Sequence, residues 1–191
     1  NHLASGLHQR GFKKGDVCAV FCPNMPEYAT IFLGVASIGG INTTVNSLYS
    51  INDLVHQFND SNAKFLITIP DFMDRALPAA KKCGIEEIFV LGEAEGATPF
   101  SELLSNDGNP PEVVIDPKND LVALPYSSGT TGLSKGVMLT HENLVSDMVL
   151  TTSINTLTDD DVLIGVLPFF HIYGMVLILN LAIFKGVSLV T

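Results

Sequence analysis

Residues 126–136 read Tyr126-Ser127-Ser128-Gly129-Thr130-Thr131-Gly132-Leu133-Ser134-Lys135-Gly136, and the rest of the chain is organised around them. The apolar run 121–124 precedes this stretch and the run 137–140 follows it. Short apolar runs bounded by turn residues are typical of buried strands. The sequence therefore predicts a polar loop between two strands, followed by a helix that opens at residues 141–144.

The residue types in this loop suit a polyphosphate ligand. Its glycines let the backbone turn and approach a ligand closely, and its serine and threonine hydroxyls can donate to phosphate oxygens. Successive backbone N–H groups in such a turn form an anion-binding concavity, and a lysine adds a mobile positive charge. The predicted phosphate-binding residues are Ser127, Ser128, Gly129, Thr130, Thr131, Gly132 and Lys135.

A Walker A motif and a flexible linker both fit the loop less well. A Walker A motif ends in Gly-Lys-Ser/Thr, whereas here Ser134 precedes Lys135 and Gly136 follows it. This order disfavours a P-loop kinase or ATPase. A flexible linker would be longer, less ordered in its residue types, and not flanked by two apolar strands.

Composition narrows the class of protein. The chain has 191 residues, of which 47% are hydrophobic and 16% charged, so it is expected to fold around a sizeable core. The formal net charge of −10 argues against a nucleic-acid partner, because phosphate backbones are bound by clustered Lys and Arg. Cys18, Cys22 and Cys83 lack metal or redox spacing and are predicted to be small apolar side chains in a reducing compartment. No metal site is predicted.

Strands and helices alternate along the sequence. The predicted strands are 17–22, 41–45, 64–69, 87–91, 121–124, 137–140, 162–167 and 187–190. The first predicted helix ends near residue 11, and the other predicted helices span about 26–38, 51–58, 71–82, 142–154 and 172–184. Ser50 with Asp53 is expected to cap the third helix, and Asp71 and Gly84 to begin and end the fourth. Alternation of this kind predicts an α/β fold with mostly parallel sheets flanked by helices.

The chain is predicted to be part of one domain with three portions. Residues 1–91 form a first α/β portion, and residues 118–191 carry the phosphate loop. The polar stretch 92–117, with a short helix at 100–104, is expected to be a surface connection. Residues 162–184 carry no Asp, Glu, Lys or Arg, which also fits a transmembrane helix. Because Pro168 and the residues after it interrupt this run, a buried strand, a loop and a buried helix are predicted instead.

The phosphate loop resembles the AMP-binding signature of the adenylate-forming enzymes. These include acyl-CoA synthetases, 4-coumarate–CoA ligases, beetle luciferases and the adenylation domains of peptide synthetases. Residues 126–141 are similar to the 4-coumarate–CoA ligase form, which usually has Pro at the place of Ser134. The segments Gly15-Asp16-Val17, Pro23-Asn24-x-Pro26-Glu27 and Val45-Asn46-x-Leu48-Tyr49 also resemble early segments of the family. The resemblance thus spans nearly the whole chain.

A second motif, Leu167-Pro168-Phe169-Phe170-His171-Ile172-Tyr173-Gly174, joins a predicted strand to a predicted helix. A lone His in an apolar segment is more often structural, but acyl-CoA synthetases carry Pro-x-Phe-His-x-Tyr/Phe at this distance from the loop. The resemblance implies that His171 borders the carboxylate and the nucleotide and that Tyr173 lines the acyl pocket. It favours a CoA ligase over a peptide-synthetase domain. Leu177 favours an acid more apolar than a hydroxycinnamate.

The activity implied by the resemblance is a two-step ligation. A carboxylic acid reacts with ATP to give an acyl-adenylate and pyrophosphate, and the thiol of CoA then takes the acyl group. Lys135 and His171 are the implied catalytic residues, ATP and CoA the substrates, and Mg²⁺ the expected metal ion, with its family ligand downstream of Thr191. The expected location is intracellular, either cytoplasmic or peroxisomal.

The chain also lacks the later motifs of the family and its C-terminal domain. It is therefore expected to be a fragment of the N-terminal domain, with little or no activity on its own. Two alternatives stay open: a non-catalytic or truncated nucleotide-binding fragment, and a luciferase-like adenylating oxygenase.

Overall fold

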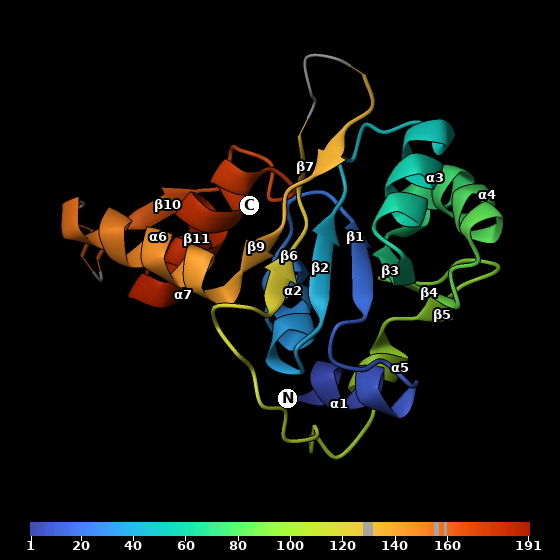
Figure 1. Ribbon diagram of the computed structural model, residues 1–191, viewed down its shortest axis with the longest axis horizontal. Coiled ribbons are helices and arrows are strands. Elements are labelled where there is room, and N and C mark those ends of the chain that lie inside the picture. Colours follow the sequence, from blue (N-terminus) through green and yellow to red (C-terminus); the bar gives the residue numbers. More distant parts are fainter. Residues whose placement is uncertain (128–131, 155–156, 159) are drawn as a thin grey trace.

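A computed structural model of the chain describes residues 1–127, 132–154, 157–158 and 160–191. Its main feature is a seven-stranded sheet in the order β5-β4-β3-β1-β2-β6-β9 (Figure 1). Every neighbouring pair is parallel except β6 and β9. The strands are β1 Val17–Phe21, β2 Ile41–Thr44, β3 Ala63–Thr68, β4 Glu87–Val90, β5 Thr98–Pro99, β6 Leu121–Ala123 and β9 Leu139–Thr140. The predicted α/β class with a mostly parallel sheet is confirmed.

Helices cover both faces of this sheet. All five residues of β1 are buried, and successive side chains point to opposite faces. Cys18 and Val20 pack in one core with α1 (His2–Gln9) and α2 (Glu27–Ser37). Val17, Ala19 and Phe21 pack in a second core with α3 (Ile51–Asp60) and α4 (Met73–Cys83). A parallel strand covered on both faces is apolar throughout, which explains the unbroken run of β1.

The ends of α3 and α4 test the predicted helix caps. At the start of α3, the Ser50 hydroxyl accepts from the Asp53 N–H and the Asp53 carboxylate accepts from the Ser50 N–H, as predicted. Gly84 ends α4 with a φ of +69°, also as predicted. The prediction that Asp71 caps α4 is wrong. A 3₁₀ turn at Pro70–Phe72 precedes the helix, and no side chain caps it.

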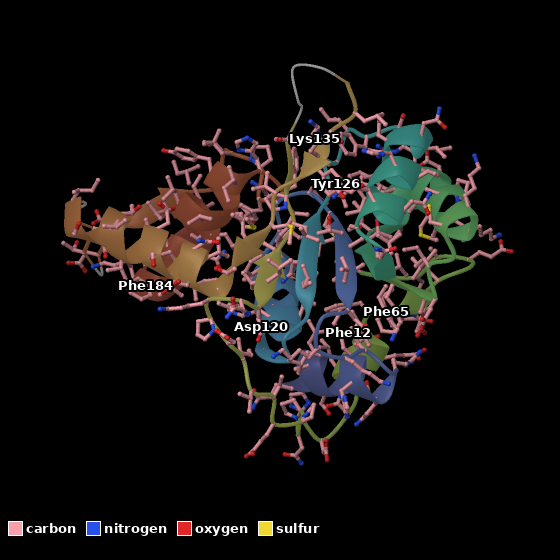
Figure 2. All side chains as sticks on the ribbon, viewed as in Figure 1. Phe12, Phe65, Asp120, Tyr126, Lys135 and Phe184 are labelled. Atoms are coloured by element: carbon pink, nitrogen blue, oxygen red, sulfur yellow. The ribbon has the colours of Figure 1, made fainter. Side chains whose placement is uncertain are left out.

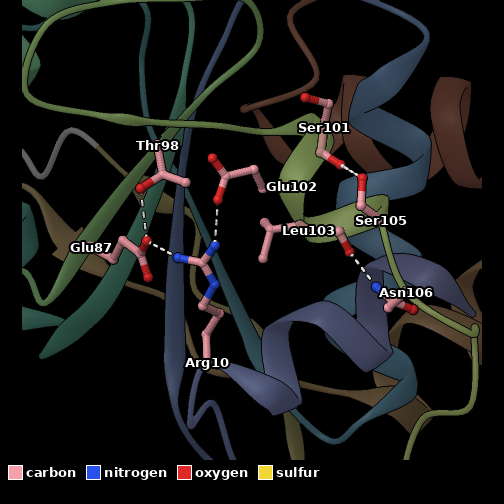
Figure 3. Close-up of polar contacts among 8 residues, drawn as sticks. All are labelled: Arg10, Glu87, Thr98, Ser101, Glu102, Leu103, Ser105 and Asn106. Atoms are coloured by element: carbon pink, nitrogen blue, oxygen red, sulfur yellow. Dashed lines mark hydrogen bonds and ion pairs between the residues drawn. The ribbon is translucent and has the colours of Figure 1, made fainter.

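The connecting segment 92–117 contributes to the sheet and to the core. It contains the edge strand β5 and the short helix α5 (Ser101–Leu104), whose Leu103 is fully buried. Arg10 at the end of α1 pairs with Glu87 of β4 and, at 2.7 Å, with Glu102 of α5 (Figure 3). Thr98 donates to the same Glu87 carboxylate at 2.8 Å. The segment is therefore anchored, although the division of the chain at 92–117 stays a prediction.

The C-terminal part extends from the β9 edge of the sheet, on the side away from α3 and α4 (Figure 1). It consists of α6 (His141–Ile154), the parallel pair β10 (Val162–Ile164) and β11 (Ser188–Val190), and α7 (Leu181–Lys185). The predicted helix 172–184 contains a π-helical stretch, Gly174–Asn180. There the Asn180 side-chain amide donates to the Met175 carbonyl at 2.8 Å. No helix in the described part of the chain is long and apolar enough to cross a membrane.

Candidate active site

A two-stranded ribbon leaves the carboxyl edge of the sheet beyond β6. It pairs β7 (Tyr126–Ser127) with β8 (Lys135–Gly136) in antiparallel register, so that Ser127 lies opposite Lys135. Figure 2 shows Tyr126 and Lys135 at this end of the molecule. The sequence predicted a loop between two strands, and β7 and β8 do pair on either side of it. The second strand of the ribbon begins at Lys135, inside the predicted loop. The predicted strand 137–140 is shorter than expected and is limited to β9. Ser128, Gly129, Thr130 and Thr131 fall outside the described residues.

Two adjoining cavities lie where the ribbon meets the sheet. The larger, of about 240 Å³, is lined by Thr44, Asn46, Tyr49, Gln57, Tyr126, Ser127, Phe170 and His171. The smaller, of about 120 Å³, is lined by Pro125, Tyr126, Ser127, Val137, Leu139, His171 and Ile172. Ser127 and His171 line both, so the structure brings the two predicted motifs together. This position, beyond the carboxyl ends of parallel strands, is where ligands bind in open α/β sheets.

Buried polar residues of β2 place the two motifs at one edge. The Thr43 hydroxyl donates to the Leu124 carbonyl at 3.0 Å, just before the ribbon. The Thr44 hydroxyl donates to the Phe170 carbonyl at 2.7 Å, just before His171. These two threonines were not predicted from the sequence as part of the site. A signal was present, because hydroxyl side chains in a strand covered on both faces must find hydrogen-bond partners.

Asn24, which follows β1, fixes the shape of the loop before His171. Its side-chain amide donates to the carbonyls of Gly165 and Leu167, both at 2.8 Å, and its carbonyl oxygen accepts from the Phe169 N–H at 2.7 Å. Gly174 lets the loop close, because a Cβ at this position would lie 2.1 Å from the Pro168 carbonyl oxygen. Neither role was predicted from the sequence.

The structure places Tyr173 differently from His171. Its side chain is 51% exposed and lines neither cavity, while its N–H donates to His171 Nδ1 at 3.3 Å. Leu177 packs against the apolar cluster that contains Phe32 and Val122. The assignment of Tyr173 to an acyl pocket therefore stays a prediction.

Tyr126 connects the ribbon to α3. Its hydroxyl donates to the Asp60 carboxylate at 2.5 Å. Burial, and then the hydrogen bond to Asp60, raise the pKa of Tyr126 well above its usual value. Tyr126 therefore stays neutral and presents a hydrogen-bond donor to Asp60. Among the described residues, no group of three or more His, Cys, Asp or Glu is arranged to hold a metal ion.

Together, the fold and the cavities define an α/β domain with a candidate ligand site at the carboxyl edge of a mostly parallel sheet. The chain belongs to the AMP-binding enzyme family, whose profile matches residues 1–191. This confirms the family resemblance seen in the two motifs.

Curated relatives and solved structures agree with this assignment. Probable 4-coumarate–CoA ligase 1 of Dictyostelium discoideum is 39% identical over 204 residues, covering 96% of this chain and 37% of the relative. 4-coumarate–CoA ligase 2 of Petroselinum crispum is 38% identical over 192 residues, covering 98% of this chain and 35% of the relative. The chain thus spans little more than a third of these relatives.

Among solved structures, a long-chain-fatty-acid–CoA ligase from Archaeoglobus fulgidus superposes with a TM-score of 0.90 at 31% identity, over 98% of this chain and 37% of that one. The ATP-bound structure of MatB from Rhodopseudomonas palustris superposes with a TM-score of 0.86 at 29% identity. It covers 100% of this chain, which again corresponds to 37% of the solved structure.

Proposed function

We propose that the protein carrying this chain activates a carboxylic acid with ATP and transfers the acyl group to CoA. The relatives support this reaction class, since two are 4-coumarate–CoA ligases and one solved structure is a fatty-acid–CoA ligase. The ATP-bound relative supports ATP as the nucleotide. In the first step a carboxylate oxygen bonds to the α-phosphorus and the bond to the β-phosphate breaks, releasing pyrophosphate. In the second, the CoA sulfur bonds to the acyl carbon and AMP leaves.

The observation that carries the proposal is the meeting of the two motifs. Ser127, from the phosphate loop, and His171, from the second motif at residues 167–174, line the same two cavities. Lys135 is exposed on the strand opposite Ser127, where its ammonium can reach a phosphate. The site thus offers a hydroxyl donor for phosphate and an imidazole side by side, and the smaller cavity adds apolar walls for an acid.

The loop would act by stabilising charge on the leaving pyrophosphate. Donors that are already in place when charge develops lower the barrier without reorganisation. In the proposal, the donors are the hydroxyls of Ser127, Ser128, Thr130 and Thr131 with nearby backbone N–H groups, including those of Gly129 and Gly132. Lys135 neutralises the phosphates further, and His171 borders the acid. When bound, Mg²⁺ would supply positive charge that offsets the charge of the phosphates, and the neutral hydroxyl donors of the loop are compatible with it.

The test is carboxylate-dependent exchange of pyrophosphate into ATP by the protein that carries this chain. Cinnamic acids and fatty acids of graded length should be compared, because the relatives point to the former and Leu177 to a more apolar acid. Exchange that requires one acid class establishes adenylation and identifies the substrate. Subsequent CoA thioester formation separates a ligase from a luciferase-like oxygenase. No exchange from folded protein favours the non-catalytic alternative.

Lys135→Ala provides the residue-level test. Loss of a charge that acts on the leaving group should lower the exchange rate at least about tenfold, with the free energy of unfolding within about 0.5 kcal/mol of wild type, because Lys135 is exposed. Lys118→Ala is the matched control, since Lys118 is also exposed but precedes β6 at the other edge of the sheet. Equal exchange rates in both variants would contradict the role of Lys135.

A further inference from the structure

Helix α3 contacts both strands of the ribbon that carries the phosphate loop. We propose that His56 and Asp60 of α3 are positioning residues, which hold β7 and β8 ready for the phosphates of ATP. This inference rests on the proposed function for its ligand. Its structural part, that α3 holds the ribbon in place, is based on contacts among the described residues.

The first contact holds the strand that carries Lys135. His56 Nε2 lies 2.8 Å from the backbone carbonyl oxygen of Ser134. Because a carbonyl only accepts, the imidazole must donate through Nε2–H. Ser134 directly precedes Lys135, so this bond fixes the backbone from which the lysine side chain extends.

The second contact holds the opposite strand. Asp60 accepts the hydroxyl of Tyr126 at 2.5 Å, and Tyr126 directly precedes Ser127. His56 and Asp60 are one helical turn apart, so both lie on the same face of α3. One helix face thus reaches both strands of the ribbon, on either side of the loop.

The contacts are supported by close packing around the Tyr126 ring. The rings of His56 and Tyr126 meet edge to face, with centroids 6.2 Å apart and planes at 90°. On β8, a Cβ at position 136 would lie 3.1 Å from the Tyr126 ring, so Gly136 allows the ring to lie against the opposite strand. His56, Tyr126, Asp60 and Gly136 form one contact cluster at the base of the loop.

The helix is itself rigidly placed. On its other face Leu54 and Phe58 are buried in the core shared with β1 and α4. The Ser50–Asp53 capping box fixes where α3 begins, and therefore which residues face the ribbon. Groups held in place before a ligand arrives reduce the ordering entropy that binding must offset. We therefore assign His56 and Asp60 to nucleotide affinity, with no direct part in the reacting atoms.

The kinetic test uses the protein that carries this chain. His56→Leu and Asp60→Ala should each raise the KM for ATP roughly threefold to tenfold, the equivalent of one lost hydrogen bond. The KM for the acid should not change. His56→Gln keeps an amide donor close to the position of Nε2, and Asp60→Asn keeps an acceptor for Tyr126, so both should recover most of the ATP affinity. His8→Leu, at an exposed histidine of α1, is the matched control.

A second measurement separates this inference from the proposed function. In the same protein, the Val137 N–H donates to the Pro125 carbonyl at 2.8 Å across the base of the ribbon. Hydrogen exchange at Val137 should be faster in His56→Leu and Asp60→Ala than in wild type and His8→Leu. If hydrogen exchange at Val137 is unchanged in these variants, α3 does not hold the ribbon in place. If hydrogen exchange is faster but the KM for ATP is unchanged, the positioning role of His56 and Asp60 is overturned. If wild-type protein binds no ATP, the proposed function fails, and exchange still decides whether α3 holds the ribbon.

Discussion

At the scale of single residues, Tyr126 shows how one motif residue can line the candidate site and also hold the ribbon against a helix. Its backbone belongs to β7, its ring lines both cavities, and its hydroxyl binds Asp60. Burial disfavours the charged phenolate, and a carboxylate acceptor disfavours it further. The neutral phenol is therefore the form that joins the ribbon to α3.

This contact predicts the titration of Tyr126. Burial and Asp60 raise the pKa of Tyr126 in the folded chain. The contribution of Tyr126 to the free energy of unfolding is therefore fully present below about pH 10, the usual tyrosine pKa. This contribution is lost as the pH rises through the higher pKa of the folded state. Tyrosinate absorbance should show a high-pH transition that is absent in Tyr126→Phe. The transition should move to lower pH in Asp60→Asn.

Asp107→Asn is the control, because Asp107 is an exposed carboxylate in the segment 92–117. The interpretation is contradicted if Asp60→Asn and Asp107→Asn give the same titration curve as wild type.

Single residues also show where sequence information ends. Ser127 and Lys135 were predicted from the chemistry of the loop, and His171 from the family resemblance; the structure brings Ser127 and His171 to the same cavities. His56 and Asp60 were not predicted, because their partners lie 78 and 66 residues away and are a backbone carbonyl and a phenol. Nothing in the spacing of α3 indicates which face meets the ribbon until the sheet order is known.

At the scale of elements, the loop between β10 and the following helix depends on Asn24 from the other half of the chain. One amide group makes three hydrogen bonds to this loop, at 2.7 to 2.8 Å. These bonds satisfy two loop carbonyls and one N–H, and Phe169 is buried against Tyr28 beside them, with ring centroids 5.7 Å apart. The position of His171 is therefore set by an element about 140 residues earlier.

Asn24→Asp tests this dependence. At neutral pH a carboxylate would replace the amide donor and face the carbonyls of Gly165 and Leu167, leaving both without that partner. The expected loss is about 2–3 kcal/mol in the free energy of unfolding, measured with denaturant. The loss should shrink at acidic pH, where the introduced carboxyl group becomes protonated and can donate one hydrogen bond.

Asn52→Asp is the matched control, because Asn52 is exposed in the first turn of α3, where a negative charge is favourable. A loss as small for Asn24→Asp as for Asn52→Asp would show that the loop holds its shape without the amide.

Elements with local signals were predicted well, and those with non-local causes were not. The capping box of α3 and the left-handed Gly84 are local in sequence, and both were confirmed. The edge strand β5 was missed because it has two residues, one of them Pro, and forms only by pairing with β4. The π-helical stretch Gly174–Asn180 was also missed, because the sequence predicted only a regular helix over residues 172–184.

At the scale of the whole molecule, the two parts of the chain differ in how they cover their apolar residues. The sheet from β1 to β4 is enclosed by four helices, and its cores hold most of the fully buried aromatic side chains, such as the Phe12–Phe65 pair labelled in Figure 2. In contrast, β10 and β11 form a two-stranded sheet on their own, and α6 has one buried residue, Leu144.

The exposed surface reflects this difference. Of the twenty large apolar side chains that are exposed in the described part of the chain, sixteen lie after residue 132. They include Val145 and Val149 on one face of α6, Ile164 on β10, and Phe184 on α7 (Figure 2). Where exposed apolar side chains lie together, they mark a place where other chains or apolar molecules bind. The C-terminal part, which carries most of these side chains, is therefore the part of the 191-residue chain where such binding is expected.

The last prediction concerns the 191-residue chain in solution. It should bind an apolar fluorescent dye and self-associate at micromolar concentration, because burying the α6 face removes apolar side chains from water. Val145→Lys with Val149→Lys should reduce both dye binding and apparent mass in sedimentation, since the two side chains are 50% and 49% exposed on adjacent turns. Leu33→Lys on α2, at a side chain 44% exposed in the covered part, should leave both measurements near wild type. A wild-type chain that stays monomeric and does not bind the dye would show that its exposed apolar surface does not drive association. Equal effects of the α6 and α2 substitutions would instead place the adhesive surface elsewhere on the molecule.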